Sequence, residues 1–157
     1  MAAIVIDRLD PRSADARALL AASDALMAAL YPAESNHLVP AEELAGPEFL
    51  FLGAFEEGRA VASAGIRLHA AKPPYGEIKR LFVLEAYRGR GLSKKLMTRL
   101  ERYAGQNGCR LTRLEVGVHQ PEAISLYRQL GYVERPPFGD YEPDPLSLFM
   151  EKSLSAA

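Results

Sequence analysis

The sequence predicts an α/β (α+β) fold in which a mixed, mostly antiparallel sheet of about seven strands is flanked by about four helices. One observation is that apolar, strand-like runs and segments of helical period follow one another in the order β-α-(α)-β-β-β-α-β-α-β-β. The other is that no break in composition divides the chain. Residues 1–157 are therefore expected to form a single domain around one core.

Capping and turn signals define the elements of the first half. Ser13 follows Pro11 and is a residue type that caps helix N-termini by accepting backbone hydrogen bonds. Three prolines and a glycine interrupt residues 32–47, and Glu56-Glu57-Gly58 separates two apolar runs as a hairpin turn. The elements expected here are a strand at 3–9, a helix from Ser13 to about Tyr31, a short helix at 41–45, and strands at 49–55 and 59–68.

The hydrophobic period changes after Gly91. Apolar residues recur at helical spacing from Leu92 to about Gln106, and most charged residues of this segment lie outside the apolar stripe. The elements expected in this half are a strand at 77–84, a helix at 92–106, a strand at 110–118, a helix at 121–130, and strands at 132–135 and 146–152. The two strand–helix–strand crossovers that result are where a ligand site is expected.

Composition excludes several functional classes. The formal net charge of -1 provides no overall field for nucleic acid, and no apolar run approaches the roughly 20 residues that span a bilayer. The first ten residues lack the layout of a signal peptide, so a cytoplasmic protein without a membrane partner is expected. Cys109 is the only cysteine, which excludes an intramolecular disulfide and a multi-cysteine metal site, and no metal cofactor is expected.

The loop from Arg88 to Ser93 lies between a strand and a helix. The first amides of a helix have no intrahelical partner, and glycines let a phosphate approach the backbone closely. Basic residues within and after the loop add charge-assisted contacts. The alternative is that Gly89 and Gly91 only form a tight turn beside a solvated basic face. The loop matches neither the Gly-Lys-Ser/Thr nucleotide loop nor the three-glycine dinucleotide fingerprint.

Three motifs occur in order: Glu77-Ile-Lys-Arg-Leu-Phe-Val83, Arg88-Gly-Arg-Gly-Leu-Ser93, and Ala123-Ile-Ser-Leu-Tyr127 followed by Gly131-Tyr132. Together they resemble the GCN5-related N-acetyltransferase (GNAT) superfamily. Ser93 departs from the glycine or alanine that the family usually has at this position. The resemblance implies a GNAT-like domain that transfers the acetyl group of acetyl-CoA to a primary amine of a small molecule or peptide.

The resemblance also implies a cofactor site. The pantetheine arm of acetyl-CoA would pair like an extra strand between residues 77–83 and 113–118. The Leu81 N–H would face the thioester carbonyl, where it would stabilise the oxyanion of the tetrahedral intermediate. The residues expected to bind acetyl-CoA are Leu81, Phe82, Val83, Arg88, Gly89, Arg90, Gly91, Leu92, Ser93 and Gln120. Gln120 stands where many relatives have asparagine.

Tyr127 matches the family tyrosine that protonates the departing thiolate, and a phenol with a pKa of about 10 keeps its proton at neutral pH. The alternative is a tyrosine that only packs on the core. Glu77 matches the general base of several family members, and the alternative is a strand-edge carboxylate paired with Lys79 or Arg67. Glu77 would share a face with Leu81 on an ideal strand, but about 13 Å away.

The acceptor is expected to bind between residues 31–37 and 137–142, which are rich in polar and aromatic groups. The residues proposed to contact it are Tyr31, Asn36, Glu115 and Tyr141, with Glu115 as a second candidate for base or amine anchor. The expected reaction is direct attack in a ternary complex. A catalytically inactive acyl-CoA-binding sensor or regulatory module is the alternative. A homodimer is a common assembly for enzymes of this size, and the sequence leaves it open.

Overall fold

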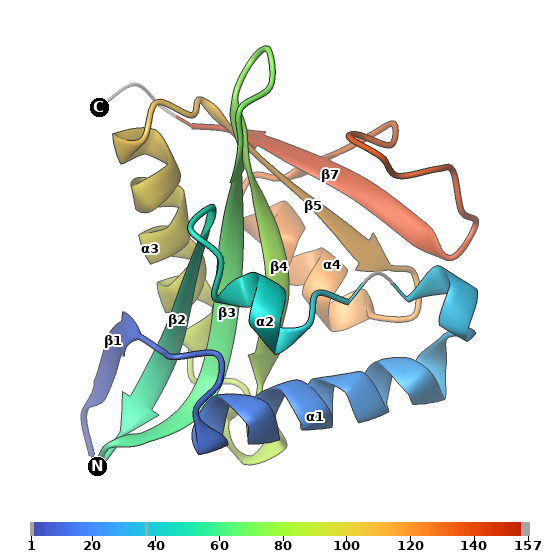
Figure 1. Ribbon diagram of the computed structural model, residues 1–157. Coiled ribbons are helices and arrows are strands. Elements are labelled where there is room, and N and C mark those ends of the chain that lie inside the picture. The colour runs from blue at the N-terminus through green and yellow to red at the C-terminus, as the bar shows by residue number, and fades with distance from the viewer. Residues whose placement is uncertain (1, 37, 155–157) are drawn as a thin grey trace.

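A computed structural model describes residues 2–36 and 38–154. Its strands form one seven-stranded sheet in the order β1-β2-β3-β4-β5-β7-β6, in which only β4 and β5 pair in parallel (Figure 1). The strands are β1 (Ile4–Arg8), β2 (Phe49–Glu56), β3 (Arg59–His69), β4 (Tyr75–Val83), β5 (Leu111–Gly117), β6 (Val133–Arg135) and β7 (Ser147–Ser153). The helices are α1 (Ala14–Leu30), α2 (Ala41–Leu44), α3 (Leu92–Gln106) and α4 (Pro121–Gln129). The predicted fold class is confirmed.

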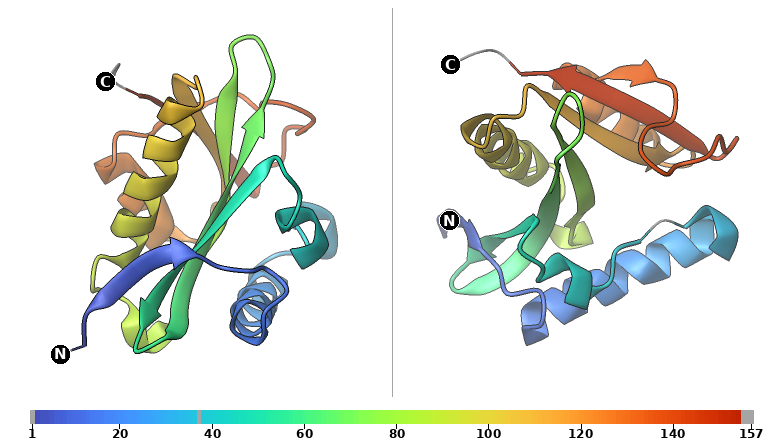
Figure 2. Two further views of the ribbon diagram at one scale, coloured as in Figure 1. Left: turned by 60° about the vertical axis from the view of Figure 1, so that its left-hand side comes forward. Right: turned by 45° about the horizontal axis from the view of Figure 1, so that its top comes forward.

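The helices form two layers on opposite faces of the sheet (Figure 2). On one face, α1 and α2 bury leucines such as Leu19 and Leu44 against Phe49 and Phe51 of β2. On the other face, the apolar stripe of α3 and Tyr127 of α4 pack against apolar residues of the sheet and form a second hydrophobic core. The amphipathic pattern of α3 therefore predicted correctly which of its residues reach the core.

Local signals in the sequence set the helix and turn boundaries. The Ser13 hydroxyl accepts a hydrogen bond from the Ala16 amide at 3.2 Å, so it caps α1 as expected. In the β2–β3 hairpin, Glu57 and Gly58 have φ angles of 51° and 78°, which identifies a two-residue turn with both residues in the left-handed region. That turn twists in the same sense as the strands and sets their register.

Strands β4 and β5 separate after a short paired stretch. Their register pairs only Tyr75 with Leu111, Gly76 with Thr112 and Glu77 with Arg113. The remainder of the two strands diverges, so their facing edges open into a cleft. Residues 77–83 and 113–118, between which the pantetheine arm is expected to pair, therefore separate beyond Glu77.

A bulge changes the phase of β4 just where the cleft begins. Between the pairs Ser63–Phe82 and Gly65–Lys79, β4 has two residues where β3 has one, and Arg80 there has a φ of 61°. Past the bulge, Leu81 packs on the core cluster under α3, whereas Glu77 contacts Tyr141. The expectation that Glu77 and Leu81 share a face is therefore wrong, because it assumed an unbroken alternation of side chains.

Candidate active site

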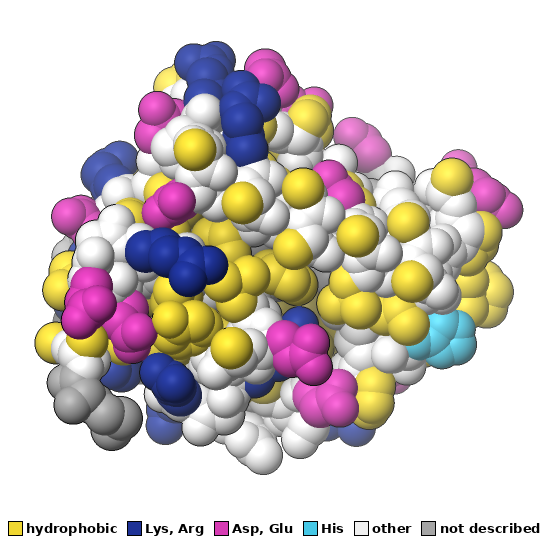
Figure 3. Space-filling view, turned by 90° about the horizontal axis from the view of Figure 1, so that it is seen from below, with side chains coloured by type: hydrophobic (Ala, Val, Ile, Leu, Met, Phe, Trp, Pro, Cys, Tyr) yellow, Lys and Arg dark blue, Asp and Glu magenta, His cyan; other side chains and the backbone are white. Residues whose placement is uncertain are grey.

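The open ends of β4 and β5 form the two walls of a cleft of about 750 Å³. The helix α1 and the start of α3 complete it. Seen from below, hydrophobic side chains gather in a hollow at the middle of this face, with charged side chains around its margin (Figure 3). Of the residues predicted to form the site, those that line the cleft are Tyr31, Asn36, Leu81, Phe82, Val83, Arg88, Gly89, Gly91, Leu92, Ser93, Glu115, Gln120 and Tyr127.

The glycine loop forms one end of the cleft. Gly89 and Gly91 have φ angles of 78° and 77°, a conformation that favours glycine, although a Cβ at either position would meet no atom within 4 Å. In the part of the chain that the structure describes, no side chain caps α3 at Gly91, so the amides that open the helix present their partial positive charge to the cleft. This geometry suits an anion such as a phosphate.

The two arginines of this loop do not both face the cleft. The Arg88 Nε donates to the Val83 carbonyl at 3.1 Å, and its guanidinium lies over the Phe82 ring, so Arg88 braces the loop against the end of β4. Arg90 does not line the cleft. Its guanidinium lies 3.4 Å from a carboxylate oxygen of Glu56 and stacks over Tyr87. In this structure the Arg90 side chain is therefore not positioned to make the predicted contact with phosphate.

The bulge in the middle of the cleft is held by α1. Arg80 is buried, and its guanidinium donates to Asp24 Oδ1 at 2.7 Å and to the Leu20 carbonyl at 3.3 Å. A residue with positive φ is costly unless the surrounding contacts hold it. The contacts with α1 thus stabilise the bulge that turns the backbone of Leu81 toward the cleft wall.

Tyr127 lies on α4 and reaches the cleft from the α3 side of the sheet. Its ring packs edge-on against Tyr132 with 5.8 Å between ring centroids. Burial, and to a smaller extent the charge of Glu115, raise the pKa of Tyr127 above its usual value of 10.0. The phenol is therefore protonated throughout the neutral range, and it both packs on the core and lines the cleft.

Glu115 is the carboxylate that β5 presents to the cleft. It accepts a hydrogen bond from the Ser147 hydroxyl at 2.8 Å. Burial is the main cause that raises the pKa values of Tyr31, Tyr127 and Tyr141, and the negative charge of Glu115 adds to each. One carboxylate therefore acts electrostatically on aromatic hydroxyls from three separate segments.

Glu77 lies in a buried polar network outside the cleft lining. Its carboxylate contacts His69 Nε2 at 2.9 Å, accepts from the Tyr141 hydroxyl at 2.6 Å and lies 3.4 Å from Lys79 Nζ. Burial alone would raise the pKa of Glu77. The hydrogen bond with His69, the Lys79 charge and the bond from Tyr141 outweigh burial and lower it. The alternative to a catalytic Glu77 was a structural carboxylate paired with Lys79 or Arg67, and Lys79 is one of its partners here.

The acceptor residues predicted from the two loops divide between the cleft and this network. The Tyr31 hydroxyl accepts from the His119 amide at 3.0 Å and its ring stacks on the His119 imidazole, so both line the cleft together with Asn36. Tyr141 does not line it and binds Lys79 and Glu77 instead. His37, at the end of the first predicted segment, lies outside the described residues.

Sequence reasoning missed part of the cleft wall. Leu26, Met27 and Leu30 of α1 line it, and their helical spacing beyond the buried Leu19 and Leu20 was the available signal. Lys79 and Arg80 also line the cleft, and no local pattern distinguished them from ordinary strand residues.

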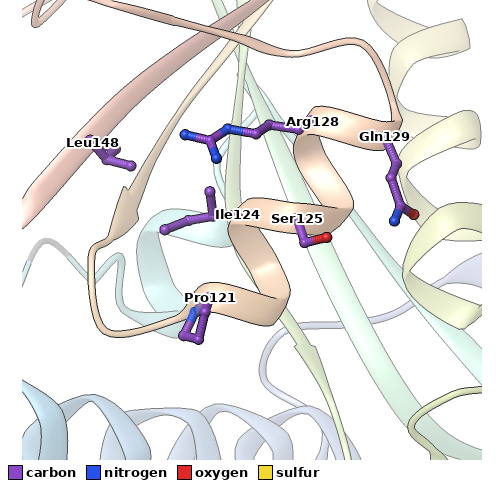
Figure 4. Close-up of a pocket in the computed structure, with 6 residues that line it drawn as sticks. All are labelled: Pro121, Ile124, Ser125, Arg128, Gln129 and Leu148. Carbon is purple, nitrogen blue, oxygen red and sulfur yellow. The ribbon is translucent and has the colours of Figure 1, made fainter.

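A second depression of about 530 Å³ lies between α4 and β7 (Figure 4). Ile124 and Arg128 extend from α4 toward Leu148, while Ser125 and Gln129 lie along the other side of the helix. Among the described residues that line it, Arg128 is the only ionisable side chain, so they offer no acid–base pair. The cleft between β4 and β5 is the better candidate for chemistry.

Within residues 2–36 and 38–154, no helix has both the length and the hydropathy needed to cross a bilayer. In the same residues, no three His, Cys, Asp or Glu side chains are grouped so as to hold a metal ion.

Comparison with known proteins agrees with the geometry of the cleft. The sequence profile of the Acetyltransferase (GNAT) family matches residues 18–132. The chain belongs to the GNAT family. Its similarity to an IAA acetyltransferase of Azospirillum brasilense is 42% identity over 151 residues, which covers 96% of this chain and 98% of that protein. The GNAT assignment and this relative together identify the chain as an acetyltransferase.

Solved GNAT structures share the fold over nearly the whole chain. A protein of Klebsiella pneumoniae assigned as an acyl-CoA N-acyltransferase superposes with a TM-score of 0.80 at 37% identity, covering 97% of this chain and 98% of that one. PaiA N-acetyltransferase from Thermoplasma acidophilum, solved with coenzyme A, has a TM-score of 0.70 at 20% identity, covering 96% and 99%. The second similarity concerns the fold alone.

Proposed function

We propose that this GNAT enzyme transfers the acetyl group of acetyl-CoA to a primary amine by direct attack within a ternary complex. One observation carries the proposal. A single cleft joins the uncapped start of α3, which suits a phosphate, to Glu115 and the protonated Tyr127, which suit proton transfer. Anion binding and acid–base groups thus occupy one continuous surface.

The residues of the cleft fit acetyl-CoA, which would supply the activated acetyl thioester. The amides at the start of α3 and Ser93 would hold the pyrophosphate. The free edges of β4 and β5 beyond Glu77 would accept the pantetheine arm as an added strand. A solved protein of the same fold was crystallised with coenzyme A, which supports this assignment. The Leu81 amide, beside the bulge at Arg80, would act on the carbonyl oxygen.

Tyr127 would act as the general acid. As the amine nitrogen bonds to the carbonyl carbon and the carbon–sulfur bond breaks, the leaving thiolate needs a proton. The Tyr127 phenol lines the cleft and holds its proton across the neutral range, because burial raises its pKa.

Glu115 would bind the acceptor ammonium and receive its proton, in preference to Glu77. Glu115 lines the cleft, whereas Glu77 is 5% exposed and lies among His69, Lys79 and Tyr141. A carboxylate with a lowered pKa and several fixed partners is a weak and poorly accessible base. Glu77 would then be a positioning residue that holds the side chains of Lys79 and Tyr141 in place.

The test begins with thermal unfolding at saturating acetyl-CoA. Ligand at about 100 times its Kd adds about 2.7 kcal/mol, which corresponds to several degrees in Tm for a chain of this size. Ser93→Ala is expected to reduce that shift. Ser125→Ala, which changes an exposed serine on α4 outside the cleft, is the matched control.

The second step measures thiol release over a panel of primary amines. Glu115→Gln should lower kcat/KM by about 10²-fold, with the acetyl-CoA shift retained. An enzyme that acetyl-CoA stabilises but that releases no thiol with any amine would support the inactive sensor instead. No shift with acetyl-CoA would contradict the proposal at its first step.

A further inference from the structure

At the end of the cleft opposite the start of α3, hydrogen bonds connect three segments of the chain. The segment after α1 carries Ser35, whose hydroxyl donates to Asp144 Oδ2 at 2.8 Å in the loop before β7. The other oxygen of Asp144 accepts from the Leu146 amide at 2.8 Å, and the Leu146 carbonyl accepts from the Val118 amide at 2.9 Å. In Figure 1 the turn that follows α1 lies next to the loop that leads into β7. These contacts form an arch over that end.

A second contact joins the same segment to the end of β5. Tyr31 is 7% exposed, and its hydroxyl accepts from the His119 amide. A Cβ added at Gly117 would collide with the Tyr31 ring, so the ring lies directly against the β5 backbone. The C-terminal end of α1 is therefore anchored at two points, through Tyr31 and through Ser35.

The interior beneath the arch is lined by apolar side chains together with polar groups that include Asn36, His119 and Glu115. Its walls include Leu26, Met27 and Leu30 of α1, and Leu38 and Leu146 from the arch. The cations that line this part of the cleft are already countered. Lys79 donates to Tyr141 and lies beside Glu77, and Arg80 pairs with Asp24. Glu115 also lines the cleft, and its carboxylate would attract an incoming ammonium.

From this geometry we infer that the acceptor is a compact primary amine with an apolar body, enclosed beneath the arch, and not the N-terminus of a polypeptide. The inference rests on the proposed function and adds the substrate class. A small amine leaves the Ser35–Asp144 contact intact once bound. A polypeptide must keep the segments apart while it occupies the site, so it loses that hydrogen bond throughout the reaction. The pantetheine arm takes part of the same cleft, which further limits the acceptor.

The experiment compares 2-phenylethylamine with a lysine-free hexapeptide that begins with phenylalanine. Both place a benzyl group beside a primary amine. The peptide amine, with a pKa of about 8 against about 10 for an alkyl amine, loses its proton more easily, so chemistry alone favours the peptide. We expect kcat/KM for 2-phenylethylamine to exceed that for the peptide by about tenfold or more, which is the factor that 1.4 kcal/mol supplies.

The variant Ser35→Ala removes the bridge but keeps the bond from Leu146 to Asp144. It should raise the peptide-to-amine ratio of kcat/KM by about three- to tenfold, the range for one hydrogen bond. Ser35→Thr, which retains the hydroxyl, should restore most of the preference. Glu34→Ala changes the exposed neighbour and should leave the ratio unchanged.

Two results would overturn the inference. One is a wild-type enzyme that acetylates the peptide as well as, or better than, 2-phenylethylamine. The other is an enzyme that acetyl-CoA stabilises but that does not acetylate 2-phenylethylamine. Both leave the cofactor assignment intact, whereas absence of stabilisation by acetyl-CoA would contradict the proposed function itself.

Discussion

From Tyr75 to Glu77, β4 pairs with strands on both sides, whereas beyond Glu77 its β5 side is open. The paired half carries a buried network in which Glu77 binds His69, Tyr141 and Lys79. The open half carries the bulge at Arg80 and the backbone that lines the cleft. The two halves therefore differ in access, because partners surround Glu77 in the paired half whereas the backbone of the open half faces the cleft.

The role of an ionisable residue in this protein thus depends on whether a ligand in the cleft can reach it, and not on its residue type alone. Glu77 and Glu115 are both carboxylates on central strands, yet only Glu115 lines the cleft. A buried and fully partnered carboxylate stabilises the fold, whereas one at an open edge can exchange a proton with a ligand. The variants below test this division between stability and catalysis.

Tyr127→Phe, in the lining of the cleft, should have the largest effect on turnover. Removal of the acid should lower kcat by about 10²- to 10⁴-fold with little change in KM for the amine. The free energy of unfolding should change by less than about 1 kcal/mol, because the ring and its packing on Tyr132 remain. Steady-state kinetics and urea unfolding measure both. Tyr103→Phe, on α3 outside the cleft lining, is the control, and an unchanged kcat in Tyr127→Phe would exclude its role as the acid.

Glu77→Gln should mainly affect stability. Loss of charge-assisted hydrogen bonds to buried partners should reduce the free energy of unfolding by about 2 kcal/mol at neutral pH. The folded-state pKa of Glu77 lies below its usual 4.5, so the unfolded chain binds the proton more readily. Its contribution is therefore complete above the unfolded-state pKa and declines as pH falls through the folded-state pKa.

Urea unfolding from acid to neutral pH should show the difference between wild type and Glu77→Gln shrink as pH falls. Glu134→Gln, an exposed carboxylate on β6, should show no such trend. If Glu77→Gln instead abolished turnover and left stability unchanged, Glu77 would be the base and the division between the halves of β4 would fail.

Arg80→Ala and Arg80→Gly should separate the side chain from the backbone at the bulge. Both variants lose the contact with Asp24, but only alanine retains the cost of positive φ. The glycine variant should be more stable than the alanine variant by about 1 kcal/mol and should retain more activity. Equal unfolding free energies and equal kcat in the two variants would show that the bulge does not depend on this conformation.

Arg90→Ala should have the smallest effect. Arg90 is half-exposed and paired with Glu56 at 3.4 Å outside the cleft, so the unfolding free energy should change by about 0.5 kcal/mol or less. Calorimetric titration should give a Kd for acetyl-CoA within about threefold of wild type, equivalent to the same small energy. A tenfold weaker Kd would mean that the Arg90 side chain moves to bind phosphate.

Within the described residues, the sequence predicted every strand and α-helix to within a few residues, because their signals are local. Ser13 caps α1 and the period of α3 identifies its buried face. The same locality explains the prediction of the Gly89–Gly91 loop, which needs left-handed backbone beside a helix start. GNAT membership followed from motifs that lie on these elements.

Tertiary structure decided what the local pattern could not. The bulge at Arg80 reverses the alternation of β4, so Glu77 and Leu81 face opposite ways. Contacts between residues distant in the sequence draw Tyr141 into the network of Glu77 and join Ser35 of the segment after α1 to Asp144 of the loop before β7. The chain alone thus determined the elements and the glycine loop before α3, because hydrogen bonds and hydrophobic period act over a few residues. Access to each carboxylate was decided only when distant segments packed together, because burial is a property of the whole fold.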